Sequence, residues 1–182
     1  KRRGGHAGCR ARHGQLQLHT IDVRPRKEGK QAVNVLVSAC LMGFGCRYDG
    51  GVRRLSCLDA LGERHVLIPV CPEVMGGLPT PRPPSEIRDG RVITRDGRDV
   101  TQAFLRGAQE AARLAQACGC GCALLKERSP SCGLGQVYDG TFTGTLTDGD
   151  GLCARLLVGR GLRVIGESQA EELLASREEK SI

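Results

Sequence analysis

The sequence predicts an α/β domain, a three-layer Rossmann-like fold around a mostly parallel sheet. Short apolar runs rich in Val, Ile and Leu alternate along the chain with segments of helical periodicity. Such runs are typical of strands buried on both faces, and their alternation with helices favours right-handed crossovers between parallel strands. The length of 182 residues suits one domain that buries its core without disulfides.

Four apolar runs predict the strands of this sheet. The first two are residues 33–39 (VNVLVSA) and 65–70 (HVLIPV), which are short and rich in β-branched side chains. The third is residues 122–126 (CALLK), and the fourth is residues 163–166 (RVIG). A short edge strand or hairpin arm is also expected at residues 91–94.

The clearest helix is expected from residue 100 to about residue 117. Apolar side chains recur there at steps of three and four residues, which places them on one face. Asp99 is a natural N-cap, and Gln102 stands where a capping box needs it. Gly119 or Gly121 can end the helix.

Three shorter helices complete the predicted alternation. They are expected at residues 56–61, at residues 151–158 and after Ser168, which is the predicted N-cap of the last one, with Glu171 completing its capping box. Residues 71–87 contain five prolines, so this segment is expected to be largely loop.

The composition narrows the class of protein. Aromatic residues make up 3% of the chain and Trp is absent, which predicts an aliphatic core. No apolar run approaches the roughly 20 residues of a membrane span, and the first 30 residues lack the apolar region of a signal peptide. We therefore predict a cytoplasmic protein with no membrane partner. Its ten cysteines then indicate reduced thiols or metal ligands rather than a disulfide scaffold.

The net charge of +7 comes entirely from the start of the chain. Residues 1–32 contain 9 Lys and Arg against 2 Asp and Glu, whereas residues 33–182 contain 18 of each kind. We expect residues 1–32 to be a basic, disordered extension and residues 33–182 to be the folded domain. A basic arm can also contact nucleic acid weakly, so nucleic acid remains an open partner. The neutral domain lacks the basic stripe and aromatics of a nucleic-acid reader.

Three cysteines follow three of the predicted strands. Cys40 follows the first, Cys71 follows the second, and Cys132 lies in the loop after the third. Ligands of open α/β sheets bind outside the carboxyl ends of the strands, so these distant thiols are expected to converge. Three thiolates suit an iron–sulfur cluster or zinc, and the spacing leaves both open, although the paired C-x-x-C typical of structural zinc is absent. A 4Fe–4S cluster on three cysteines would leave one iron open as a Lewis acid.

Polar side chains stand next to these cysteines. Glu73 comes two residues after Cys71, where it can serve as a general base for water or as a stabilising charge at a helix start. Ser129 and Ser131 flank Pro130 beside Cys132, in a turn whose N–H groups can bind a sulfide or a substrate oxygen.

Five sequence blocks occur around these residues in a fixed order. They are residues 37–50 (VSACLMGFGCRYDG), 69–73 (PVCPE), 76–82 (GGLPTPR), 126–133 (KERSPSCG) and 138–142 (YDGTF). Together they resemble the thiouracil desulfidase family, long described as a domain of unknown function. The resemblance spans about residues 33–170.

The resemblance implies a cofactor, a site and a reaction. The cofactor is a 4Fe–4S cluster, held by Cys40, Cys71 and Cys132, with one iron left open. Glu73 corresponds to the catalytic carboxylate of the family, and Ser129 to its active-site serine. The implied reaction is a non-redox desulfidation of a small thiolated pyrimidine of the 2-thiouracil or 4-thiouracil type. It exchanges C=S for C=O and releases hydrogen sulfide.

Cys46 keeps a second interpretation open, because it lies six residues after Cys40 and can reach the same point. As a fourth ligand it would close the site and make the chain a non-catalytic iron–sulfur or zinc-binding protein. It can equally be a buried structural thiol or a sulfur relay. Arg82 and Lys126 can bind a substrate oxygen or phosphate, or can be ordinary solvated charges.

The other thiols and the two YDG aspartates have structural explanations. Cys118, Cys120 and Cys122 form a thiol-rich turn that can attract metal, but small residues at a tight helix-to-strand turn also explain them. Asp49 and Asp139 are typical Asx-turn residues. Two more cysteines are expected to pack as small hydrophobes, namely Cys57 and Cys153.

Overall fold

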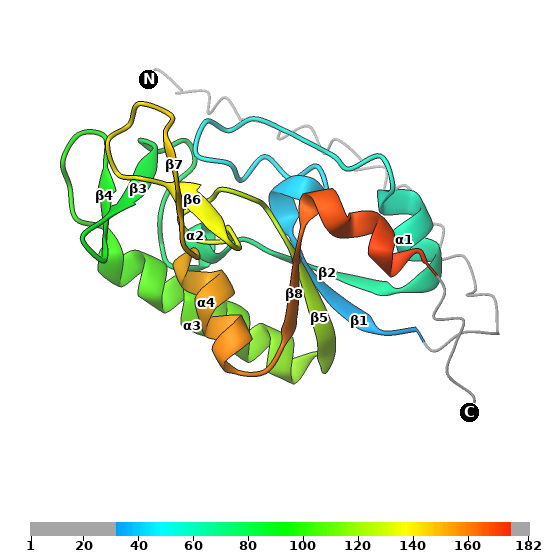
Figure 1. Ribbon diagram of the computed structural model, residues 1–182. Coiled ribbons are helices and arrows are strands. Elements are labelled where there is room, and N and C mark those ends of the chain that lie inside the picture. Colours follow the sequence, from blue (N-terminus) through cyan, green and yellow to red (C-terminus); the bar gives the residue numbers. More distant parts are fainter. Residues whose placement is uncertain (1–31, 176–182) are drawn as a thin grey trace, which may run out of the picture.

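The protein contains one four-stranded parallel sheet and two small antiparallel hairpins, in a computed structural model that describes residues 32–175 (Figure 1). The sheet strands are β1 (Asn34–Ser38), β2 (Val66–Val70), β5 (Cys120–Leu125) and β8 (Arg163–Gly166). Their order in the sheet is β2-β1-β5-β8, and every neighbouring pair is parallel. The predicted fold class is therefore confirmed. All four predicted strands occur, with ends shifted by no more than two residues.

Helices cover both faces of the sheet and make the three layers. They are α1 (Leu58–Arg64), α3 (Thr101–Ala117), α4 (Leu152–Gly159) and the 3-10 helix η2 (Glu167–Leu173). One apolar cluster lies under α3 and α4 and includes Leu36 and Ala111, both fully buried. The other lies under α1 and η2 and includes Val35 and Leu61. Alternate residues of β1 thus point into opposite clusters, as the pleat of a strand requires.

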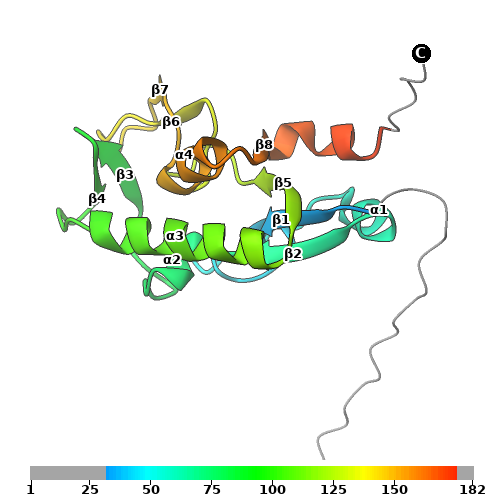
Figure 2. The same ribbon diagram turned by 90° about the horizontal axis from the view of Figure 1, so that it is seen from below.

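The long helix α3 ends where the sequence predicts but begins one residue later, so Val100 rather than Asp99 holds the N-cap position and the predicted capping box with Gln102 does not form. The Asp99 carboxylate accepts the backbone N–H of Thr101 at 2.9 Å, which satisfies one of the free donors at the helix start. Gly119 follows the last turn with a φ of +56°, the left-handed conformation that a glycine adopts at little cost. Figure 2 shows α3 running along one side of the sheet and on towards the hairpins.

Two local expectations are wrong. The first short helix starts at Leu58 rather than Ser56. The last helix starts at Glu167, so Ser168 lies inside it and donates its hydroxyl to Glu127 instead of capping it. Residues 71–87 are largely loop, as expected, but they also contain the one-turn helix α2 (Pro72–Met75) and most of a strand.

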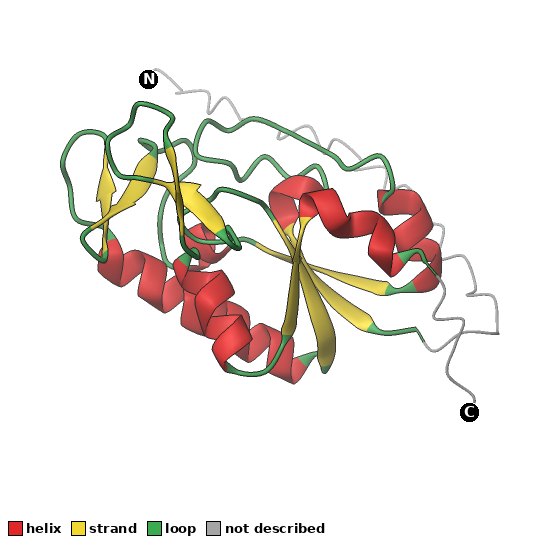
Figure 3. Cartoon of the chain, viewed as in Figure 1, coloured by secondary structure: helices red, strands yellow, loops and turns green. Residues whose placement is uncertain are grey.

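The two hairpins lie beyond the carboxyl ends of the parallel strands (Figure 3). One pairs β3 (Ser85–Arg88) with β4 (Arg91–Thr94), and the other pairs β6 (Gln136–Tyr138) with β7 (Leu146–Asp148). Only β4 was expected from the sequence. Strands of three or four residues carry too few alternating positions to show a periodic pattern.

Helix α2 packs against α3 at a distance that only glycine allows. A Cβ on Gly107 would lie 1.8 Å from the carbonyl oxygen of Pro72, and a Cβ on Gly76 would lie 2.0 Å from the carbonyl oxygen of Ala103. The two backbones therefore touch directly. This contact fixes the chain immediately after Cys71, because Pro72 is the next residue.

No helix in the described part of the chain is long and apolar enough to cross a membrane. The predicted basic extension, residues 1–32, falls outside the described residues except for its last position. Its predicted disorder and its predicted contact with nucleic acid therefore stay predictions.

Candidate active site

A cavity of about 510 Å³ lies at the carboxyl edge of the parallel sheet. Its inner wall comes from the ends of β1, β2 and β5, and its outer wall comes from the two hairpins. Both its place and its size are typical of a small-molecule site in an open α/β fold. Its lining includes all five site residues expected from the sequence, which are Cys40, Cys71, Glu73, Ser129 and Cys132.

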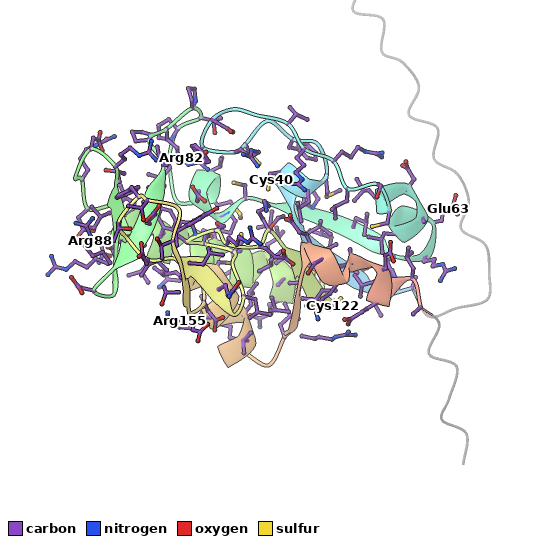
Figure 4. All side chains as sticks on the ribbon, turned by 45° about the horizontal axis from the view of Figure 1, so that its top comes forward. Cys40, Glu63, Arg82, Arg88, Cys122 and Arg155 are labelled. Atoms are coloured by element: carbon purple, nitrogen blue, oxygen red, sulfur yellow. The ribbon has the colours of Figure 1, made fainter. Side chains whose placement is uncertain are left out.

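Each predicted ligand thiol reaches this cavity from the end of its own strand. Cys40 lies in the 3-10 turn η1 (Ala39–Leu41) directly after β1, as Figure 4 shows near the middle of the molecule. Cys71 stands between β2 and α2, and Cys132 follows β5 in the turn of residues 126–133. Although 31 and 61 residues separate them along the chain, the parallel strands bring these positions to one rim.

A fourth thiol, Cys46, lies in the same cavity. The Cys71 thiol donates a long hydrogen bond of 3.8 Å to the backbone carbonyl oxygen of Cys46. The structure therefore places Cys46 beside one predicted ligand, in the long loop after β1. This geometry is compatible with a ligand, with a structural thiol and with a group that handles sulfur.

Burial and neighbouring thiols raise the pKa values of Cys40, Cys46 and Cys132 and so favour their protonated forms. Burial, followed by the neighbouring Cys71, raises the pKa of Cys40 to about 11 and that of Cys46 to about 12. The pKa of Cys132 is raised well above its usual value, mainly by burial and then by Cys153. A cationic group bound among the thiols would reverse this preference, because metal binding requires thiolates and releases their protons.

The thiols at the cavity are suitable ligands for an iron–sulfur cluster. Four cysteines line it, and cysteine thiolates are the ligands that hold 4Fe–4S clusters in proteins. Among residues 32–175, no group of three or more His, Cys, Asp or Glu is arranged so that it could hold one metal ion.

Glu73 lies in the first turn of α2 and faces the cavity. Its Oε2 accepts a 2.7 Å hydrogen bond from Nε of Arg82, and both side chains are mostly buried. Its Oε1 has no hydrogen-bond partner among the described residues, so it is available to a water or a substrate. The hydrogen bond at Oε2 therefore orients the carboxylate, and Oε1 remains open to the cavity.

Arg82 is a structural hub rather than a free cation. Besides Glu73, its guanidinium donates to the carbonyl oxygens of Pro79 and Cys46 and to the hydroxyl of Thr80. Four of its five N–H groups are thus used within the protein. The structure assigns it the role of tying α2 to the loop that carries Cys46.

Ser129 has its acceptor capacity filled and its donor free. Its Oγ accepts the backbone N–H groups of Ser131 at 3.1 Å and Cys132 at 3.2 Å. A hydroxyl that accepts twice still has one O–H to donate, and Ser129 lines the cavity. The serine therefore holds the Cys132 turn in shape and can donate one hydrogen bond to a bound molecule.

Cys153 is a neighbour of the site that the sequence analysis missed. It was expected to pack as a small hydrophobe, and it is fully buried at the start of α4. However, its pKa is raised to about 12 by burial and then by Cys71, and its thiol in turn raises the pKa of Cys132. No sequence spacing links Cys153 to these residues, because only the packing of α4 brings it there.

The other candidates of the sequence analysis have partners within the protein, although Lys126 also lines the cavity. The Lys126 ammonium pairs with Glu167 at 2.9 Å. Asp49 and Asp139 each accept a backbone N–H two residues on, from Gly51 and Thr141, which is the Asx-turn geometry expected for them. The thiol-rich turn of residues 118–122 lies at the amino end of β5, the end opposite to the cavity.

Comparisons with known proteins show the family to which the chain belongs. The sequence profile of a family described as 2-thiouracil desulfurase matches residues 35–169. The uncharacterized protein YbbK of Bacillus subtilis (strain 168) is 37% identical over 150 residues, which cover 77% of this chain and 99% of the relative. A solved structure described as the 4Fe–4S-dependent thiouracil desulfidase TudS is 47% identical, with a TM-score of 0.72, and the match covers 78% of this chain and 95% of that one.

Proposed function

Because the chain belongs to the 2-thiouracil desulfurase family, we propose that it hydrolyses the C=S bond of a small thiolated pyrimidine. The proposed net reaction adds the oxygen of water to the ring carbon and releases the sulfur as hydrogen sulfide. The two hydrogens of water leave with the sulfur, so no oxidant or reductant is consumed. The observation that carries the proposal is the meeting of three strand-end thiols, one open carboxylate oxygen and one free hydroxyl in a single cavity.

The cofactor of the family is a 4Fe–4S cluster, which the similar thiouracil desulfidase depends on. In this chain Cys40, Cys71 and Cys132 would hold it, since all three line the one cavity at the carboxyl edge of the sheet. When bound through three thiolates, the cluster supplies an iron without a protein ligand, a soft Lewis acid that draws electrons from the C=S bond.

Glu73 is proposed as the base that handles the proton of water. Its Oε1 is open to the cavity, while the hydrogen bond from Arg82 to Oε2 fixes the plane of the carboxylate. A carboxylate held in this way can take a proton from a water that approaches the ring carbon. The same proton can then pass to the departing sulfur.

Ser129 is proposed to orient the ring. Its O–H is free because both N–H contacts at its Oγ are accepted ones. The exocyclic oxo and thiocarbonyl groups of a thiouracil are acceptors for such a donor, whereas its ring N–H groups are donors. The serine would thus set which ring atom faces the thiols.

A second candidate function follows from the contact between Cys46 and Cys71. If Cys46 binds the cluster as a fourth thiolate, no iron remains open. The chain would then hold an iron–sulfur cluster, or zinc, without turning over a substrate. One set of variants decides between the two functions.

The experiment replaces each of the four thiols by serine and loads every variant with iron and sulfide under anaerobic conditions. Cluster content is measured by iron and sulfide analysis and by the visible absorption of the cluster. We expect the changes at Cys40, Cys71 and Cys132 to abolish stable loading. The change at Cys46 should retain both the cluster and sulfide release from 2-thiouracil or 4-thiouracil. Exposed Ser56, changed to alanine, is a control that should change neither.

The results separate the candidates cleanly. Loss of the cluster in the Cys46 variant, together with no sulfide release by the wild type, would support the closed four-thiolate site. A loaded wild type that releases no sulfide from any thiolated pyrimidine would refute the proposed reaction, whatever Cys46 does.

A further inference from the structure

The aromatic side chains of this protein gather at the cavity. The whole sequence has three Phe, two Tyr and no Trp. Three of these five rings line the cavity, namely Tyr48, Tyr138 and Phe142, whereas Phe104 alone is fully buried in the core. The core of this protein is mainly aliphatic, and most of its aromatic rings lie at the cavity instead. Such rings are suited to stacking on a planar ring.

Phe142 stands in an unusual backbone conformation at the outer wall. Its φ is +59°, in the left-handed region, which is rare for a bulky residue. Left-handed residues without a short polar side chain persist only where surrounding contacts impose them, and they concentrate at ligand sites. Contacts from the surrounding chain must therefore hold Phe142 in this conformation.

Glu86 supplies those contacts. It is 8% exposed, lies on β3 and lines the cavity. Its Oε2 accepts the backbone N–H of Phe142 at 2.9 Å and that of Gly140 at 2.9 Å. One carboxylate oxygen of the first hairpin thus holds both ends of the three-residue bend that presents Phe142.

The loop of residues 139–145, which carries Phe142, also packs closely against β3. A Cβ on Gly140 would lie 2.7 Å from the carbonyl oxygen of Ile87, so the two backbones approach as only glycine permits. Arg88, labelled in Figure 4 on this hairpin, donates from Nε to the Gly140 carbonyl oxygen at 3.0 Å. The hairpin and the loop therefore act as one support for Phe142.

Arg95 completes the wall from the loop after β4. Its guanidinium carbon lies 5.6 Å from the centroid of the Phe142 ring, within the range of a cation–π contact. A guanidinium contacts a ring from one face, and Phe142 also lines the cavity, where a second planar group can approach it. Arg95 also lines the cavity, so the pair offers flat surface and positive charge together.

We propose that Phe142 is a specificity-determining residue that stacks on the pyrimidine ring, and that Glu86 is a positioning residue that holds Phe142 in place through its backbone. This inference rests on the proposed function for the identity of the ring. It assigns the two walls different tasks: the thiol wall with Glu73 performs the chemistry, and the hairpin wall binds the heterocycle.

The hydrogen bonds of Glu86 distinguish positioning from catalysis. Both N–H groups reach the same oxygen, so the carbonyl oxygen of a glutamine can accept both. Glu86→Gln should therefore keep ring binding and turnover within about threefold of the wild type. Glu86→Ala leaves two N–H groups unpaired and should raise KM about tenfold or more, with a smaller change in kcat. The melting temperature of each variant is compared with that of the wild type, so that a change in KM is not mistaken for a loss of folding.

Ring binding is measured by anaerobic isothermal titration calorimetry of uracil on the cluster-loaded protein. Uracil has no sulfur to lose, so its binding does not depend on turnover. Phe142→Asn keeps a residue that tolerates the left-handed conformation but removes the ring, and Phe142→Tyr keeps the ring. We expect the Asn variant to bind uracil at least tenfold more weakly and the Tyr variant to bind within threefold of the wild type, with equal cluster content.

The outcomes are separable from those of the proposed function. A wild type that releases sulfide from thiouracil while Phe142→Asn binds uracil equally well would overturn the role of Phe142. Wild-type protein that binds no uracil at millimolar concentration would overturn it too. A Glu86→Gln variant that binds uracil normally but loses turnover would show that the charge of Glu86 acts on the reaction, and it would overturn the positioning role. Failure of the wild type to release sulfide counts against the proposed function alone.

Discussion

Nε of Arg82 donates a 2.7 Å hydrogen bond to Oε2 of Glu73, and the Arg82 side chain in this pair is only 5% exposed. A guanidinium that donates to one carboxylate oxygen fixes the orientation of the carboxylate. The same arginine also donates to the backbone of the loop that carries Cys46. One ion pair therefore joins the proposed base to the loop that closes the thiol side of the cavity.

The first prediction concerns the charge of Glu73. Glu73→Gln should keep the cluster but lower turnover on thiouracil by roughly 10²-fold or more, the usual range for loss of a general acid–base group. Initial rates of sulfide release and the visible absorption of the cluster measure the two effects. Glu110→Gln, which breaks an exposed ion pair with Arg113 on α3, is the matched control and should leave both unchanged. Unaltered turnover in the Glu73 variant would return this residue to a purely structural role.

The second prediction concerns the geometry of Arg82. Arg82→Lys keeps the charge but cannot reproduce four directed N–H contacts, so buried acceptors lose their partners. The free energy of unfolding should fall by about 2 kcal/mol or more, as measured by urea denaturation. Arg113→Lys, at an exposed pair, should change it by less than about 0.5 kcal/mol. Equal stability of the two variants would contradict the role of Arg82 as a hub.

The third prediction concerns the hydroxyl of Ser129. Ser129→Ala removes the free donor and leaves the N–H groups of Ser131 and Cys132 without their acceptor. Turnover should fall by about 10²-fold, comparable to the loss of one preorganised donor. Ser129→Thr retains the hydroxyl and should recover most of the rate, which would separate the chemistry of the group from its size. A threonine variant as slow as the alanine variant would argue against a hydrogen-bonding role.

The fourth prediction concerns the contact between α2 and α3. Gly107→Ala places a methyl group 1.8 Å from the carbonyl oxygen of Pro72, so the two helices must separate. Unfolding free energy should drop by about 3 kcal/mol or more, the upper range for an overpacked site. Because Pro72 lies between Cys71 and Glu73, cluster loading should also become less complete. Gly159→Ala, where no atom lies within 4 Å, is the control and should be neutral or slightly stabilising.

The parallel sheet and its helices could be predicted because their signals are local. Apolar runs such as residues 65–70 and the periodic face of α3 are long enough to show their period in the sequence. Knowing only that the strands are parallel was then enough to bring Cys40, Cys71 and Cys132 to one edge. The positions of these three cysteines after predicted strands were therefore sufficient to predict that they lie at one edge of the sheet.

The outer wall of the cavity could not be predicted, because it depends on contacts between distant segments. The strands β6 and β7 have three residues each, which is too short for a pattern. Glu86 reads in the sequence as an ordinary charge on a proline-rich loop, and only the docking of residues 139–145 on β3 buries it. Cys153 is likewise brought near the thiols by the packing of α4, and no spacing announces it.

Three of the four sheet strands, β1, β2 and β5, are each followed by a cysteine that lines the cavity, and the hydrogen-bond register between these strands sets how far apart their ends lie. The crossovers between them are free to lengthen or shorten without shifting those ends. Relatives can therefore differ widely in the intervals between the three cysteines while keeping the same site. A search that fixes those intervals would overlook such relatives, whereas one that looks for a cysteine in the segment after each of these three strands would find them.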